Sequence, residues 1–261
     1  MSEAATPPKK SDLGVRTASA VVMIAVAGSA LWLGGYWWTA FVAAVALGVL
    51  WEWWGLVRAF SSAMLPRTLW IAGGLIYIVP AGLALMGLRN HDLGIALVML
   101  VAGSVIGVDV CAYFAGRTFG GPKIAPKISP SKTWAGLAGA MVGATLVMCG
   151  WFGFMAVSSG CPVMDGPQLS RWQCAMSPVV RHGWLFVAEG VLLAVVAQSG
   201  DFFESWMKRR AGVKDSGNLI PGHGGLFDRV DGLIAVSFVL GLVGLAYRLA
   251  IARDVAGSIA N

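Results

Sequence analysis

The stretch LGIALVMLVAGSVIGVDVCAYFA, residues 93–115, carries one charged side chain, Asp109, and is otherwise mostly aliphatic. A helix of about 20 apolar residues crosses the hydrocarbon core of a bilayer. Six other stretches share this character, so the sequence predicts about seven transmembrane helices, at Val15–Leu33, Tyr36–Val57, Leu69–Leu88, Leu93–Ala115, Trp134–Val157, Trp184–Phe203 and Val230–Ile251. Glycine- and proline-broken stretches such as Gly73–Pro80 leave eight or nine crossings open. The sequence therefore indicates an all-α, polytopic integral membrane protein.

The composition excludes an ordinary cytosolic enzyme. Hydrophobic residues make up 57% of the chain and charged residues 12%, which is about half the charged share of a soluble domain. The 12 Trp and 35 Gly fit a bilayer, because Trp collects at its interfaces and Gly is common in its helices. The four Cys form no C-x-x-C pair, so a zinc or thiol-redox site is not expected.

The basic residues indicate the orientation. With seven spans, fourteen of the 19 Lys and Arg residues lie on the side of the N-terminus, and such residues concentrate in cytoplasmic loops. We therefore expect a protein of the cytoplasmic (inner) membrane with its N-terminus and active site facing the cytoplasm. No basic stretch is interleaved with aromatic residues, so membrane lipids, and not nucleic acid, are the expected partners of the net charge of +6.

The chain is expected to have three parts. Residues 1–14 form a disordered cytoplasmic tail, 15–100 an N-terminal transmembrane bundle, and 101–261 a catalytic transmembrane region with cytoplasmic loops at 116–133 and 204–229. On the opposite side, Cys161 and Cys174 are expected to form a disulfide, the alternative being two unpaired thiols.

One helix face near the end of the sixth span carries unusual charge. Acidic residues inside a span cost about 2.5 to 3.5 kcal/mol on insertion scales. At 100° per residue, Asp201, Glu204, Ser205 and Lys208 fall within an arc of about 100°. An interfacial helix end whose basic residues contact lipid phosphates would also explain this face.

The next segment favours an active site over a helix end that only contacts lipid phosphates. SGNLIPGHGG, residues 216–225, can turn freely at its glycines and present successive N–H groups to an anion. Asp228 and Asp231 follow, three residues apart, on one face of the next helix. Carboxylates that share a small site repel, and a hard cation such as Mg²⁺ relieves the repulsion and grips phosphate oxygens. Phosphoryl or nucleotidyl transfer is the reaction class that suits this set.

A second set lies in DVCAYFAGRTFGGPKIAPKISPSKTWAG, residues 109–136. Asp109, Tyr113 and Arg117 recur every four residues and share a helix face. The loop after them carries further polar and basic residues, namely Lys123, Lys127, Ser129, Ser131, Lys132 and Thr133. Two prolines favour a shaped loop, and a loop that only contacts lipid headgroups is the alternative.

Together these residues resemble a known family. SWMKRRAGVKDSGNLIPGHGGLFDRVD, residues 205–231, is similar to the signature of phosphatidate cytidylyltransferases (CDP-diacylglycerol synthases), which read S-x-x-K-R, four residues, K-D, and a stretch ending P-x-H-G-G-x-x-D-R-x-D. QSGD (198–201), SPSKTW (129–134) and the tripeptide Trp51–Trp53 also resemble family motifs. Ala135 stands where relatives usually have Glu after K-T-W, so Glu52 or Glu204 would supply that charge, or the Glu is dispensable.

The resemblance implies a membrane enzyme that joins phosphatidic acid to CTP, uses Mg²⁺ alone or with a second cation, and forms a homodimer. The metal candidates are Asp201, Asp215, Asp228 and Asp231, of which two or three would be true ligands. The expected catalytic residues are Asp201, Lys208, Lys214, His223 and Arg229. The expected substrate-binding residues are Ser129, Lys132, Ser205, Arg209, Gly224 and Gly225. Asp109 would organise the upstream loop or be structural.

Two other functions remain open from the residues. A CTP-dependent lipid kinase of the dolichol type would also bind CTP at a membrane face but would transfer the γ-phosphoryl group. A transporter would use Asp109 and Glu52 to line a path through the bilayer. The concentration of charge at one face argues against the transporter.

Overall fold

The computed structural model describes residues 13–158, 171–222 and 224–260. Within them the chain forms seven helices and one two-stranded hairpin, in the order α1 (Leu13–Leu33), α2 (Gly35–Phe60), α3 (Met64–Arg89), α4 (Gly94–Phe119), β1 (Lys123–Ala125), β2 (Ser129–Thr133), α5 (Trp134–Ser158), α6 (Arg171–Arg210) and α7 (Phe227–Ala260). Each of the seven helices is long and apolar enough to cross a membrane. The expected all-α membrane protein with seven spans is confirmed, and Gly73–Pro80 lies inside the unbroken α3.

Some boundaries differ from the sequence-based ones. α6 continues to Arg210 and α7 begins at Phe227, so the segment between them covers residues 211–226 and is shorter than the expected loop 204–229. α4 likewise continues to Phe119. The disulfide expected between Cys161 and Cys174 lies outside the part of the chain whose side chains the structure describes.

The segment between α4 and α5 forms an antiparallel hairpin that the sequence did not reveal. Lys123 pairs with Thr133, and Ala125 pairs with Ser129, with an irregularity between them. A two-stranded hairpin is marginal alone, but Thr133 also caps α5, because its hydroxyl accepts a hydrogen bond from the Gly136 N–H at 3.0 Å. The hairpin is thus attached to the helical body.

Small residues bring α4, α5 and α6 close together. A Cβ at Gly139 would lie 2.6 Å from the Cys111 carbonyl oxygen, so only glycine permits this approach of α5 to α4. The core between the three helices includes the fully buried Ala140, Ala144 and Ala194. Such small-residue contacts are the usual way in which membrane helices pack, because lipid provides no hydrophobic force between them.

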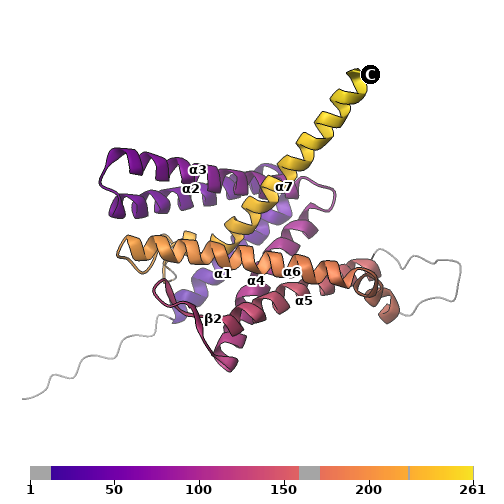
Figure 1. Cartoon of the computed structure of the whole chain (residues 1–261), viewed down its shortest axis with the longest axis horizontal. Helices are drawn as coiled ribbons and strands as arrows, with labels where there is room; N and C mark the ends of the chain where they lie inside the picture. Colours follow the sequence, from indigo (N-terminus) through magenta and orange to yellow (C-terminus); the bar gives the residue numbers. More distant parts are fainter. Residues whose placement is uncertain (1–12, 159–170, 223, 261) are drawn as a thin grey trace, which may run out of the picture.

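Aromatic residues fill the contact among α2, α3, α6 and α7. The buried Trp53 ring lies 5.7 to 6.4 Å, centroid to centroid, from the rings of Trp70, Tyr77, Phe203 and Phe227. Its indole N–H donates to the Trp70 carbonyl at 2.9 Å. α2 and α3 run side by side, and the C-terminal half of α7 projects beyond the bundle (Figure 1).

The hairpin, the C-terminal end of α6 and the segment 211–226 lie at the same side of the molecule (Figure 1). The N-terminal end of α1 is there too, because a Cβ at Gly222 would lie 3.2 Å from the Arg16 side chain. The segments that contain the predicted site residues therefore lie at the end of the molecule where α1 begins.

Candidate active site

Three carboxylates form a compact cluster between α6 and α7. One oxygen from each of Asp201, Glu204 and Asp231 lies within 4.8 Å of the others. The two helices approach this closely because residue 200 is glycine: a Cβ there would lie 2.7 Å from the Asp231 carbonyl oxygen. The predicted polar face of α6 thus contacts Asp231 of α7. Glu204, which was not among the metal ligands predicted from the sequence, becomes a candidate as well.

Two lysines form ion pairs with the cluster. Lys132 of β2 forms an ion pair with Asp201, and Ser205 also donates to Asp201, at 3.2 Å. The Lys208 ammonium lies 2.6 Å from both Glu204 and Asp228. Asp201, Ser205 and Lys208, all expected in the site, are therefore brought together.

The cluster has the composition of a site for a hard cation. Three carboxylates crowd one place, and oxygen donors are the ligands that Mg²⁺ prefers. Glu204 is fully buried, and its Oε1 atom receives no hydrogen bond from any residue that the structure describes. A buried carboxylate oxygen without a donor is costly. Mg²⁺ therefore fits the residues present.

Asp228, another expected metal ligand, has different partners. Its Oδ2 atom accepts hydrogen bonds from the backbone N–H groups of Ser216 and Gly225, each at 2.9 Å, and its Oδ1 atom faces Lys208. Both oxygens are thus occupied by protein donors. Asp228 closes the glycine-rich segment onto the start of α7, and Asp215, the fourth expected ligand, is exposed on that segment.

Several N–H groups in the glycine-rich segment and just after it donate to protein carboxylates. Ser216 and Gly225 donate to Asp228, while Leu226 and Phe227 donate to Glu52. The turn itself needs glycine, since Gly222 and Gly224 have φ of 75° and 84°. Gly225 was expected to bind substrate, but its N–H group already donates to Asp228.

Glu52 is a site residue that the sequence analysis left without a definite role. It lies on α2, it is 3% exposed, and it contacts a segment more than 160 residues away in the sequence. The available signal was its position as a carboxylate inside an apolar span.

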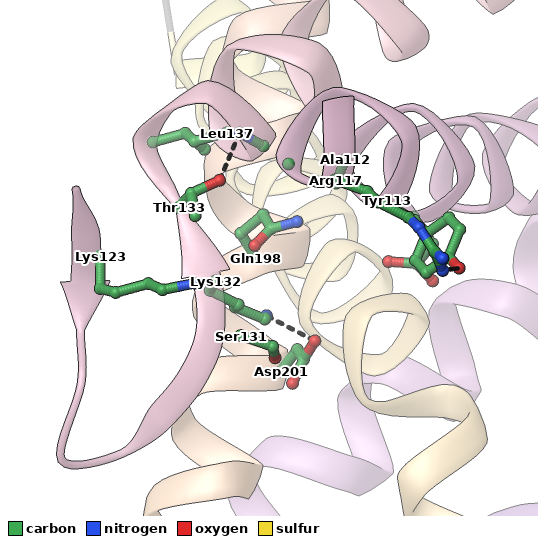
Figure 2. Close-up of a pocket in the computed structure, with 13 residues that line it drawn as sticks. Ala112, Tyr113, Arg117, Lys123, Ser131, Lys132, Thr133, Leu137, Gln198 and Asp201 are labelled. Atoms are coloured by element: carbon green, nitrogen blue, oxygen red, sulfur yellow. Dashed lines mark hydrogen bonds and ion pairs between the residues drawn. The ribbon is translucent and has the colours of Figure 1, made fainter. Parts of the chain in front are cut away.

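A polar cavity of about 480 Å³ lies beside the acidic cluster, between α4, the hairpin, α5 and α6. Figure 2 shows Lys132 pointing at Asp201 in the wall of this cavity, with Lys123 on the neighbouring strand. Arg117 donates to the Tyr113 hydroxyl at 2.7 Å. The charged and polar residues that line the cavity include Asp109, Arg117, Lys123, Ser131, Lys132 and Gln198. The predicted shared face of Asp109, Tyr113 and Arg117 is the wall of this cavity.

Other expected residues lie elsewhere. Ser129 is buried in β2, and Ser131 lines the cavity in its place. Arg209 donates to the Ile128 carbonyl at 3.3 Å and so ties α6 to the hairpin. Lys214 and Arg229 are exposed, and His223 is outside the described residues. Ala135 occupies the second position of α5, outside the residues that line the cavity.

A second cavity, of about 540 Å³, lies on the opposite face of α6 and is mainly aromatic and aliphatic. Trp53, Tyr77, Phe203 and Phe238 contribute to its wall, together with Gly73 of α3. One helix thus separates a polar cavity from an apolar one.

Fold and site together define a polytopic membrane protein with a charged cavity of about 480 Å³ beside an acidic cluster. Residues 60–246 match the model of the cytidylyltransferase family. The chain is 32% identical to a phosphatidate cytidylyltransferase of Brucella suis biovar 1 (strain 1330), over 91% of this chain and 95% of the relative. It is 34% identical to a phosphatidate cytidylyltransferase of Rickettsia bellii (strain RML369-C), over 92% and 94%. The chain belongs to the cytidylyltransferase family.

Proposed function

We propose that this protein transfers CMP from CTP to phosphatidic acid, giving CDP-diacylglycerol and pyrophosphate. The observation that carries the proposal is the position of Asp201, which both lines the polar cavity and belongs to the acidic cluster. A bound polyanion in that cavity would therefore lie against the residues suited to a cation. Membership of the cytidylyltransferase family supports CTP as the donor.

In this reaction a phosphate oxygen of phosphatidic acid attacks the α-phosphorus of CTP. The bond from that phosphorus to the oxygen bridging the α- and β-phosphates breaks, and its electron pair leaves with pyrophosphate. Both reactants are anions, so catalysis depends mainly on positioning and on neutralising charge. No covalent intermediate with the protein is needed.

The polar cavity suits the nucleotide. Its volume of about 480 Å³ is within the range of small-molecule pockets. Lys123, Lys132 and Arg117 supply positive charge along its wall, and cationic side chains hold phosphate oxygens through charge-assisted hydrogen bonds. Lys132 would exchange part of its contact with Asp201 for a phosphate of CTP.

Asp201, Glu204 and Asp231 would hold Mg²⁺. When bound, the ion neutralises phosphate charge and orients the reacting groups. Lys208 keeps Glu204 and Asp228 in place beside it. Asp215 and Asp228 remain weaker candidates, because one is exposed and the other is held by protein donors.

The lipid substrate needs an apolar surface next to the site. The apolar cavity meets this need: Gly200 and Phe203 of α6 line it, one residue before and two residues after Asp201. We place an acyl chain of phosphatidic acid against this wall, with its phosphate at the acidic cluster and CTP on the other side of α6.

The proposal includes the orientation and the assembly. The N-terminus and the site face the cytoplasm, as the distribution of Lys and Arg indicates, and the membrane is the inner one. The family resemblance implies a homodimer. Light scattering of the detergent-purified protein tests the dimer, and a molar mass of one chain would exclude it under those conditions.

Labelled CTP tests the reaction directly. Purified protein in detergent would be incubated with phosphatidic acid, Mg²⁺ and CTP labelled at either the α- or the γ-phosphate. We expect the α-label in the lipid and the γ-label in pyrophosphate, and neither with Asp201→Asn. A γ-label in the lipid would instead identify a lipid kinase, and no labelled lipid at all would refute the proposal.

A further inference from the structure

Glu52 on α2 is tied by three hydrogen bonds to the glycine-rich segment and to the two residues that follow it. Its Oε2 atom accepts from the Ser216 hydroxyl and the Phe227 N–H, both at 2.8 Å. Its Oε1 atom accepts from the Leu226 N–H at 2.9 Å. We propose that Glu52 is a positioning residue for the transfer reaction: from outside the substrate cavity, it fixes the segment that holds Asp228 and Lys208 in place.

Burying the Glu52 carboxylate costs free energy unless hydrogen bonds compensate for the lost hydration. Glu52 is almost fully buried, and it follows and precedes tryptophans in the mostly apolar helix α2. Its three hydrogen-bond donors are all neutral groups. Charge-assisted hydrogen bonds to a carboxylate are stronger than neutral ones, so the carboxylate holds the segment more firmly than an amide or a hydroxyl would.

The segment is shaped around the carboxylate. A Cβ at Gly217 would lie 2.7 Å from the Glu52 carboxyl carbon, and a Cβ at Gly225 would lie 2.7 Å from Oε2. These two glycines lack the positive φ of Gly222 and Gly224. Gly217 is therefore required by the space that Glu52 occupies, and Gly225 by the space of Glu52 and of the Ser216 hydroxyl bound to it, which lies closer still to such a Cβ.

A continuous set of polar contacts leads from Glu52 to the reacting centre. Ser216 bonds Glu52 through its hydroxyl and Asp228 through its N–H. Asp228 bonds Lys208, and Lys208 bonds Glu204 of the acidic cluster. Without Glu52, the Ser216 hydroxyl and the N–H groups of Leu226 and Phe227 lose their acceptor. Asp228 and then Lys208 would therefore lose their fixed positions.

The hairpin side of the site has separate attachments. Lys132 bonds Asp201, and Arg209 bonds the hairpin carbonyl of Ile128. This separation gives the inference, which rests on the proposed function, a definite kinetic signature. Loss of Glu52 should lower kcat while leaving KM for CTP unchanged.

The test is Glu52→Gln, which keeps the size of the side chain and replaces one acceptor oxygen by a donor that faces N–H groups. We expect kcat to fall about 100-fold, because a displacement of about 1 Å costs that much. Ser216→Ala removes one of the three bonds and should lower kcat less. Glu189→Gln, the same change at an exposed position of α6, is the matched control.

A second readout does not depend on activity. Trypsin should cleave after the exposed Lys214 faster in Glu52→Gln and Ser216→Ala than in the wild type, well below their melting temperatures. A wild-type kcat and cleavage rate in both variants would refute the inference, and so would a raised KM for CTP with an unchanged kcat. If Glu52→Gln does not fold, Ser216→Ala decides by the same two criteria. If the wild type makes no CDP-diacylglycerol, the proposed function fails, while the cleavage rates still test Glu52.

Discussion

The two segments that follow α4 and α6 reach the site by different means. The segment 211–226 and the first residue of α7 are held by two carboxylates, Glu52 and Asp228, which together accept five hydrogen bonds from Ser216, Gly225, Leu226 and Phe227. The hairpin of β1 and β2 is attached through Lys132, Thr133 and the Ile128 carbonyl, and its Lys123 and Lys132 line a cavity. We therefore expect the first segment to act as a fixed scaffold for the acidic cluster and the hairpin to contact substrate.

The largest effect should come from the cluster itself. Asp231→Asn removes a negative charge from the expected Mg²⁺ site, so kcat should fall by orders of magnitude while the melting temperature in detergent stays near that of the wild type. The activity that remains should need more Mg²⁺. Wild-type turnover with an unshifted Mg²⁺ titration would remove Asp231 from the site.

Asp228→Asn, one helical turn away, should act through structure. The amide cannot accept from both N–H groups and from Lys208, so the variant should lose about 1 to 3 kcal/mol of stability, as expected when buried donors lose their acceptor. Activity should fall less than in Asp231→Asn. Thermal unfolding measures the difference, and an unchanged melting temperature with a shifted Mg²⁺ requirement would make Asp228 a metal ligand after all.

Lys132→Ala tests the hairpin. Loss of the ammonium removes a contact to the triphosphate and frees Asp201, so KM for CTP should rise about 10-fold or more, as for one lost charged hydrogen bond. Lys127→Ala, in the exposed turn of the same hairpin, is the control and should behave as the wild type. Equal kinetics for the two variants would make the hairpin structural only.

The smallest effect is expected in the apolar cavity. Gly73 lines it, and a Cβ there meets nothing within 4 Å, so we expect Gly73→Leu to narrow the cavity. KM for phosphatidic acid should rise a few-fold and KM for CTP should not change. Gly87→Leu, on the same helix and equally unhindered, should leave both unchanged. An equal effect of the two variants would refute an acyl chain at this wall.

The sequence predicted most of the fold and part of the site. Seven spans followed from hydropathy, because each helix must satisfy its own backbone hydrogen bonds inside lipid. The hairpin was missed because residues 123–133 are rich in Lys, Pro and Ser and lack the alternation of a half-buried strand. Asp201, Ser205 and Lys208 were found together because helical spacing is a local property.

The sequence by itself therefore determined the membrane class, the helices, the grouping of charges on the side of the N-terminus and the residues of the signature. Only the tertiary structure decided their partners. Asp228 and Asp231 look equivalent in the sequence, yet one closes the glycine-rich segment and the other joins α6, because α7 turns them toward different neighbours. Glu52 lies 175 residues from Phe227. A buried carboxylate must find its donors wherever packing supplies them, and that distance cannot be read from local spacing.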